Sequence, residues 1–182
     1  MKTKNFLLTG ALLIMALFSV NGVMAQAPVA PTGTTNVHIK LNGIQSITVG
    51  QTDVDLVYTT IEDYNNGVDT KMSDHLTVYS VGAFVVKVSS DGKFKTTTGE
   101  EISAGTVTIT AEKQESSPGD LYPVVFNTGT AITEQPLITS EVGGFNKKYN
   151  VIYEHAFTDE ANAFQNKVGI YTAIVTYDIS PS

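Results

Sequence analysis

Three histidines and four pairs of acidic residues are the side chains of this 182-residue chain that could support chemistry. His38, His75 and His155 lie far apart in the sequence, so no two of them have a spacing typical of a metal site. No G-x-S-x-G motif is present to place a serine on a sharp turn beside one of them. Cysteine is absent, which excludes thiol catalysis, thiolate zinc sites and disulfides. We therefore expect no catalytic residue, no bound metal and no cofactor.

The acidic pairs lie between the apolar segments of the sequence. They are Asp53/Asp55, Glu62/Asp63, Glu100/Glu101 and Asp159/Glu160. Two carboxylates can hydrolyse a glycosidic bond only when both face one cleft, and nothing in the sequence indicates that they do. Loop carboxylates of exported proteins can also bind calcium, but no D-x-[DN]-x-[DN]-G loop is present. We interpret these acids as solvated loop residues and the protein as a non-enzyme.

The N-terminal segment has the three-part layout of a secretory signal peptide. Lys2 and Lys4 precede an apolar run from Phe6 to Val20, and small residues lead to a cleavage-like end at Ala25. The apolar run is shorter than the ~20 residues that a membrane-spanning helix needs. We expect residues 1–25 to be removed, leaving no membrane insertion. The protein would then be extracellular, on the cell surface or periplasmic.

The charge of the chain argues against two classes of partner. All 11 basic residues are lysines, and they are outnumbered by 18 acidic residues. An acidic surface without arginine repels phosphate backbones and lacks the bidentate group that recognises them. We therefore expect no nucleic-acid binding and no adsorption to anionic lipid.

Beyond an extended leader, residues 26–35, the sequence alternates between apolar and polar residues in the way that strands do. The expected strands include residues 37–41, 54–58, 76–78, 84–88, 107–111, 149–153 and a final strand after Gly169. Residues 59–67 and 158–167 have helical caps but are long enough only for single turns. The sequence therefore predicts an all-β domain over residues 36–182, a two-sheet sandwich of about eight to ten short antiparallel strands.

Two glycine turns and the final strand give expectations about pairing. Asp91-Gly92 suits a type I′ hairpin, whereas a hairpin at Asn42-Gly43 would put Ile47 on the polar side. Either a bulge corrects the register there or the chain turns toward a second sheet, and we favour the turn. The final strand should bury the face that carries Tyr171, Ala173, Val175, Tyr177 and Ile179. We expect it to lie inside a sheet and to pair with residues 148–157.

The final strand GIYTAIVTYDIS resembles the closing strand of secreted bacterial immunoglobulin-like surface modules and pilin-type subunits. The segment DHLTVYSVGAFVVKVSS, residues 74–90, resembles their central strand pair. The resemblance implies an immunoglobulin-like β-sandwich with a structural or adhesive role in the cell envelope, and it transfers no catalytic residue. The chain departs from classical chaperone–usher pilins because it has no cysteine for their early disulfide.

Two groups of residues are candidates for binding. Val37, Ile39 and Leu41 could be donated as a strand to a neighbouring subunit, or they could pair within their own domain. Tyr149 and Tyr153 could face a ligand such as a glycan, or they could fill the core with their hydroxyls at its rim. The first hypothesis is a pilus or filament subunit that works by self-association or by adhesion to another surface protein. The alternative is a carbohydrate-binding module of the envelope.

Overall fold

The computed structural model describes residues 33–102, 105–158 and 167–182. The chain divides into two units, Met1–Lys40 and Leu41–Ser182. In the first unit residues 33–40 are described, and they are exposed and form no helix or strand. The predicted signal peptide, most of the leader and the pair Asp159/Glu160 lie outside the described residues, as does nearly all of the helical turn expected at 158–167.

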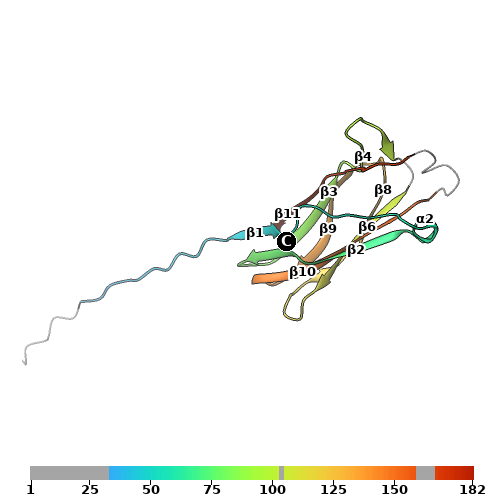
Figure 1. Cartoon of the computed structure of the whole chain (residues 1–182). Coiled ribbons are helices and arrows are strands. Elements are labelled where there is room, and N and C mark those ends of the chain that lie inside the picture. Colours follow the sequence, from blue (N-terminus) through green and yellow to red (C-terminus); the bar gives the residue numbers. More distant parts are fainter. Residues whose placement is uncertain (1–32, 103–104, 159–166) are drawn as a thin grey trace, which may run out of the picture. The chain divides into compact units, whose positions relative to one another are not determined.

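The second unit is built from two antiparallel sheets (Figure 1). The five-stranded sheet has the order β1 (Gln45–Val49), β2 (Val68–Ser80), β10 (Gly144–Ala156), β6 (Thr106–Lys113) and β8 (Val124–Asn127). The four-stranded sheet has the order β11 (Val175–Pro181), β3 (Phe84–Ser90), β9 (Ile132–Ser140) and β7 (Asp120–Leu121). A small pair, β4 (Phe94–Lys95) and β5 (Glu101–Ile102), and a short helix, α2 (Ile61–Asn66), complete it. The predicted fold class, an all-β two-sheet sandwich, is confirmed.

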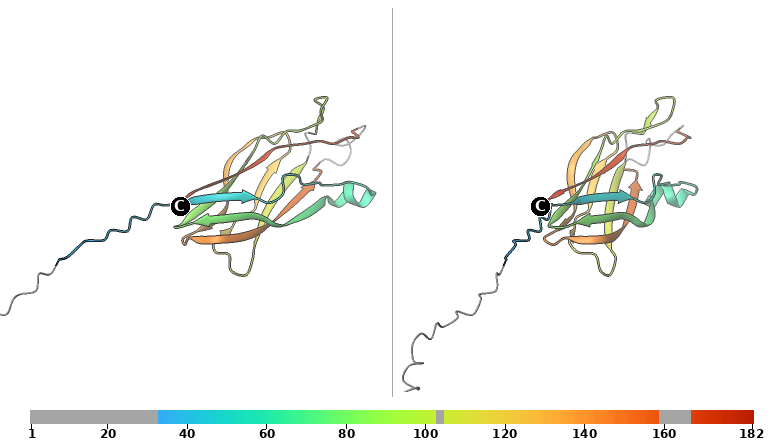
Figure 2. Two further views of the ribbon diagram at one scale, coloured as in Figure 1. Left: turned by 60° about the vertical axis from the view of Figure 1, so that its left-hand side comes forward. Right: turned by 90° about the vertical axis from the view of Figure 1, so that its left-hand side faces the viewer.

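Two further views show the strands of the two sheets facing each other (Figure 2), and buried side chains of both sheets form one core cluster. Alternate residues of the long strands are fully buried: Leu76 and Val78 on β2, Phe84, Val86 and Val88 on β3, and Tyr149 and Val151 on β10. Burying such a side chain contributes about 1.5–3 kcal/mol relative to leaving it in water. The two-residue period of the sequence therefore fixes which face of each strand meets the other sheet.

Two of the expected strands are not strands in the structure. Residues 37–41 form none, because the first strand begins only at Gln45. Residues 54–58 also form none, although Val54 and Leu56 pack against the core. There the alternation reflects side-chain burial without backbone pairing. Residues 54–58 are linked to the sheet through the Thr70 Oγ1, which donates to the Asp55 carbonyl at 2.7 Å, and through the Tyr58 hydroxyl, which contacts His155.

The expected pairing of the final strand is wrong, although its expected inner face is correct. β11 pairs with β3, with Tyr177 opposite Val88, and it is an edge strand rather than an inner one. The residues from Tyr171 to Ile179 that share the inner phase are half-buried, and those between them are exposed. The short separation in sequence favoured a hairpin with β10, but β10 belongs to the other sheet, so the two strands meet across the core.

The expected hairpin at Asp91-Gly92 is also wrong. β3 pairs with β9 and β11, whereas β4 pairs with β5. Gly92 has a φ of 65° and bends the chain out of the sheet, and its carbonyl accepts a hydrogen bond from the Gly129 N–H at 2.6 Å. The glycine is thus required by a close backbone approach and not by a two-residue turn.

The single helical turn expected at residues 59–67 is confirmed as α2. Thr60 is its N-cap, and Thr60 and Asp63 form a capping box in which each side chain bonds to the other's backbone N–H. The Asp63 carboxylate also accepts from the Thr59 N–H at 2.7 Å. These backbone hydrogen bonds, that of Thr59 first, lower the pKa of Asp63 to about 2. One member of the acidic pair Glu62/Asp63 therefore has a structural role.

Candidate functional site

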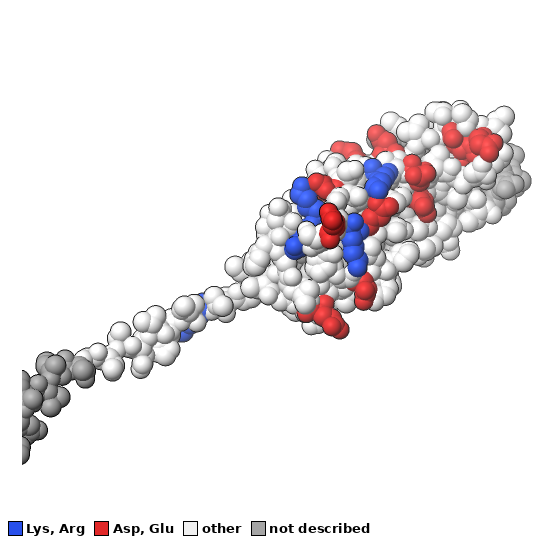
Figure 3. All heavy atoms as spheres, turned by 90° about the horizontal axis from the view of Figure 1, so that it is seen from below, with Lys and Arg blue, Asp and Glu red and all other residues white. Residues whose placement is uncertain are grey.

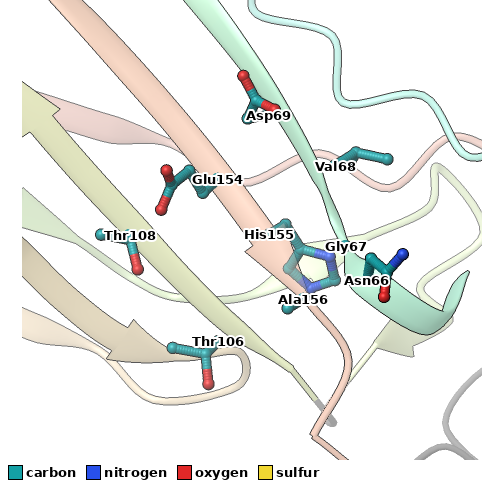
Figure 4. Close-up of a pocket in the computed structure, with 9 residues that line it drawn as sticks. All are labelled: Asn66, Gly67, Val68, Asp69, Thr106, Thr108, Glu154, His155 and Ala156. Carbon is teal, nitrogen blue, oxygen red and sulfur yellow. The ribbon is translucent and has the colours of Figure 1, made fainter. Parts of the chain in front are cut away.

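A polar pocket of about 370 Å³ lies over strands β2, β10 and β6 of the five-stranded sheet (Figure 4). Glu154 on β10 is directly opposite Asp69 on β2 and directly opposite Thr108 on β6. These side chains line the pocket together with Thr106. The two carboxylates, of Glu154 and Asp69, are exposed. The sheet therefore places two carboxylates and two hydroxyls side by side.

The lining of this pocket can form hydrogen bonds with a polar ligand. Like charges directly opposite on neighbouring strands repel each other, and here solvent exposure limits that cost. Within the described residues no group of three or more His, Asp or Glu side chains could hold a metal ion. The pocket thus offers acceptors for hydroxyl groups.

His155 lines this pocket beside Gly67 (Figure 4), and Gly105 also lies close to its ring. A Cβ at Gly67 would lie 2.6 Å from the His155 carbonyl oxygen, and one at Gly105 would lie 2.5 Å from its Nε2. The Tyr58 hydroxyl contacts both the carbonyl oxygen and Nδ1 of His155, each at 2.7 Å. Because that hydroxyl has one proton, which goes to the carbonyl, Nδ1 must carry a hydrogen and donate to the tyrosine oxygen.

Burial lowers the pKa of His155 to about 4 and raises that of Tyr58 to about 12. The unfolded chain therefore binds a proton below about pH 6.5 that the folded protein excludes. The stability that this group contributes is complete above that pH, and it is lost progressively as the pH falls from about 6.5 to the folded value of about 4. His155 is thus a buried, hydrogen-bonded histidine that is neutral at pH 7.

We expect wild-type protein to lose about 2 kcal/mol of unfolding free energy between pH 7 and pH 5 through His155 alone. The unfolding free energy of H155Q should therefore fall by about 2 kcal/mol less than that of wild type between the same two pH values. Urea unfolding at both pH values measures this difference. His38→Gln, a change in the exposed segment, is the control and should keep the wild-type dependence. Equal losses in wild type and H155Q would contradict the assignment.

His75 belongs to a second buried network, which links the two sheets. Its Nε2 lies 2.8 Å from the Tyr153 hydroxyl, which in turn bonds to the Tyr177 hydroxyl on β11. Its Nδ1 lies 2.8 Å from the Oε1 of Gln51, whose amide nitrogen donates to the Ser73 carbonyl. Since Oε1 can only accept, Nδ1 carries the hydrogen and Nε2 accepts from Tyr153. Burial lowers the pKa of His75, so this network holds the imidazole neutral.

The tyrosines considered as ligand-facing are core residues. Tyr149 is fully buried, and its hydroxyl donates to the Pro118 carbonyl at 2.6 Å. Tyr153 is 7% exposed, and its hydroxyl is engaged with His75 and Tyr177. Neither ring can form a stacking surface for a sugar. Both rings fill the core and both hydroxyls are hydrogen-bonded, which agrees with the second of the two possibilities given for them in the sequence analysis.

The candidate strand residues, in contrast, are among the most exposed apolar side chains. Val37, Ile39 and Leu41 are 81%, 83% and 86% exposed, and Ile44, which follows them, is 64% exposed. Residues 33–44 form no strand. Ile44 forms the last contact at the end of β2, where its carbonyl accepts from the Val81 N–H at 3.1 Å. The structure gives no support to pairing of residues 37–41 with the described part of their own domain, while donation in trans stays a prediction.

The remaining charged candidates do not gather at one place. His75 and His155 belong to separate networks, and Glu101 forms an ion pair with Lys95 at 2.8 Å. On the face drawn in Figure 3, lysines lie among acidic side chains. Two exposed ion pairs of the five-stranded sheet, Lys71–Glu112 and Lys148–Asp74, show the same mixture. Exposed pairs of this kind contribute at most about 1 kcal/mol each.

Sequence reasoning missed the Asp69–Glu154 pair and the free edge of β8. The two acids are far apart in the sequence, and only the register of β2 with β10 brings them together. The uncharged run Val124–Asn127 was a signal for β8, but a four-residue strand is too short to show a clear period.

Comparisons with protein-family models, with curated proteins and with solved structures find no match to this chain. No helix among the described residues is long and apolar enough to span a membrane. The two-sheet sandwich therefore defines the structural class of this protein, and its function is inferred from the arrangement of the residues described above.

Proposed function

We propose that this protein is an exported, non-catalytic structural subunit that assembles by strand pairing, with residues 37–44 as the linking strand. The observation that carries the proposal is the exposure of Val37, Ile39 and Leu41, each above 80%, in an extended segment without a strand partner in the described chain. We refer to residues 37–44 as the linker segment.

The linker segment has the chemistry of a strand whose partner is another molecule. Val37, Ile39 and Leu41 alternate with His38 and Lys40, so in a strand these three side chains would lie on one face. Each of them gains about 1.5–3 kcal/mol when it is removed from water. Added to a sheet edge, such a segment gains backbone hydrogen bonds for affinity and alternate side-chain contacts for specificity.

Other features support a structural role. The core networks occupy His75, His155 and their tyrosine partners, which leaves them without a free reactive group. The predicted signal peptide would deliver the mature chain to the envelope or beyond it. An acidic, arginine-free surface favours partners that are proteins rather than phosphate backbones.

Ile39→Lys should weaken self-association of the mature protein by at least about tenfold, because one buried apolar side chain is replaced by a charge. His38→Lys places the same charge on the opposite face and should leave association close to wild type. Sedimentation velocity over a wide range of protein concentration measures both. Indistinguishable association of the two variants would refute the role of this apolar face.

The alternative function, glycan binding, is favoured by one observation, the row of Asp69, Glu154 and Thr108 in the polar pocket. It is the weaker candidate because Tyr149 and Tyr153 are buried and offer no stacking surface. A glycan array probed with wild type and with Glu154→Gln tests it. Binding that E154Q abolishes would support this function, and an array without any binding would remove it.

A further inference from the structure

We infer that the free edge of β8 is the surface that accepts the linker segment of a second copy. This inference rests on the assembly proposed above and assigns its acceptor. It follows from the composition of the sheet edges, from the direction of the backbone groups on β8 and from the charge of the linker segment.

The edges of the four-stranded sheet are poor acceptors. β11 carries Asp178 and ends at Pro181, and β7 has only two residues. β9 is open beyond its short pairing with β7, but this stretch contains Glu134 and Pro136. Charges, prolines and short strands at an edge are the usual protection against pairing with another chain. The edges of the five-stranded sheet, β1 and β8, contain neither a charge nor a proline.

The backbone of β8 presents Val125 outward. Val124 to Asn127 pair with Ile109 to Thr106 of β6, and the next residue, Thr128, donates its N–H to the Gly105 carbonyl at 2.9 Å. Hydrogen-bonded pairs alternate along an antiparallel ladder, so Val124 and Phe126 are bonded to β6. The N–H and C=O of Val125 must then point away from β6, and no backbone partner for them is found among the described residues.

The same edge leaves apolar surface exposed. The Val125 side chain is 57% exposed. On β1 the exposed side chains are Ser46, Thr48 and Val49, and Val49, the apolar one, is 39% exposed at the end of the strand. Cross-strand neighbours lie about 4.5–5.5 Å apart, close enough for a valine to pack on an added apolar side chain. β8 therefore combines free backbone groups with a more exposed apolar side chain than β1 offers.

Charge favours a second copy of this chain as the occupant. The stretch from Gln26 to Thr52 contains Lys40 and no acidic residue, whereas the chain beyond it contains eight lysines and all 18 acidic residues. The linker segment of one copy is thus attracted to the acidic body of another. Because the strand leaves one copy and enters the next, the contact is heterologous and generates open filaments unless a rotation closes it into a ring.

Val125→Pro is the most selective test. Proline removes only the N–H of residue 125, which points away from β6, so the sandwich should fold. The incoming strand loses the hydrogen bond from that N–H and clashes with the proline ring. We expect the dissociation constant of the mature protein to rise at least about tenfold. Val49→Pro is the matched control: Gly50 donates to the His75 carbonyl, so the Val49 N–H on β1 also points outward. V49P should associate like wild type.

Val125→Lys is a second variant that keeps the backbone intact, and circular dichroism reports whether each variant folds. A folded V125K that associates like wild type would overturn the assignment of β8. If I39K abolishes association while neither β8 variant changes it, assembly by the linker segment stands and the acceptor lies elsewhere. If I39K has no effect either, both proposals fail. Weakening by V49P alone would assign the acceptor to β1 and contradict this inference.

Discussion

Replacing Phe84 by alanine is expected to cost about 3–5 kcal/mol of unfolding free energy, a large part of the stability of a domain of this size. Phe84 is fully buried at the start of β3, where it is opposite Pro181 of β11 and Ser140 of β9. The truncation therefore leaves a cavity beside two strands that cannot move apart without breaking the sheet. Urea unfolding followed by circular dichroism measures the loss.

Phe145→Ala is the matched control for this substitution. Phe145 is 65% exposed, at an irregularity in the pairing of β10 with β2. Its removal should change stability by no more than about 0.5 kcal/mol. Equal effects of F84A and F145A would mean that the core does not lie between the two sheets.

Gly92→Ala is the second substitution with a large expected effect. A Cβ at this position would lie 2.0 Å from the Thr130 carbonyl oxygen, and the backbone φ of 65° is one that side chains disfavour. The clash is with backbone, so one of the two chain segments must shift. We expect a loss of about 3 kcal/mol, from the conformational cost and the overpacking together.

Gly82→Ala provides the control, because a Cβ there meets nothing within 4 Å and the backbone is not in the left-handed region. Its stability should stay within about 1 kcal/mol of wild type, with a gain as the expected direction. Thermal midpoints of the two variants can be compared directly. A neutral G92A would show that the crossing beside β3 is looser than described.

The sequence was sufficient to predict the fold class and the inner faces of most strands. Each follows from a period of two over five or more residues, as in residues 84–88 and 107–111, where burial alternates as expected. The short helix was also predictable, because its capping residues, Thr60 and Asp63, act within one turn.

Strand pairing was not predictable, because it depends on contacts between distant residues. The final strand was expected beside its nearest neighbour in the sequence, but Tyr177 meets Tyr153 across the core and its backbone pairs with β3. The alternation at 37–41 led to a strand that the structure does not contain. A period of two identifies residues that suit a sheet, and it does not identify the sheet or the molecule that supplies it.

The candidate sites divide in the same way into features that follow from the period of one strand and features that depend on how strands pair. The burial of Tyr149 and Tyr153 follows from their phase with Val151, whereas the polar pocket and the free edge of β8 depend on register. The linker segment is the part of the functional hypothesis that the sequence provided. The edge proposed to receive it emerged only from the order of the sheets.

The most direct measurement is the mass of the mature protein in solution, with and without residues 26–42, by light scattering after size-exclusion chromatography. The account predicts oligomers or filaments for the intact chain and a folded monomer for the truncated one. An intact chain that stays monomeric at high concentration, or a truncated chain that assembles equally well, would contradict it.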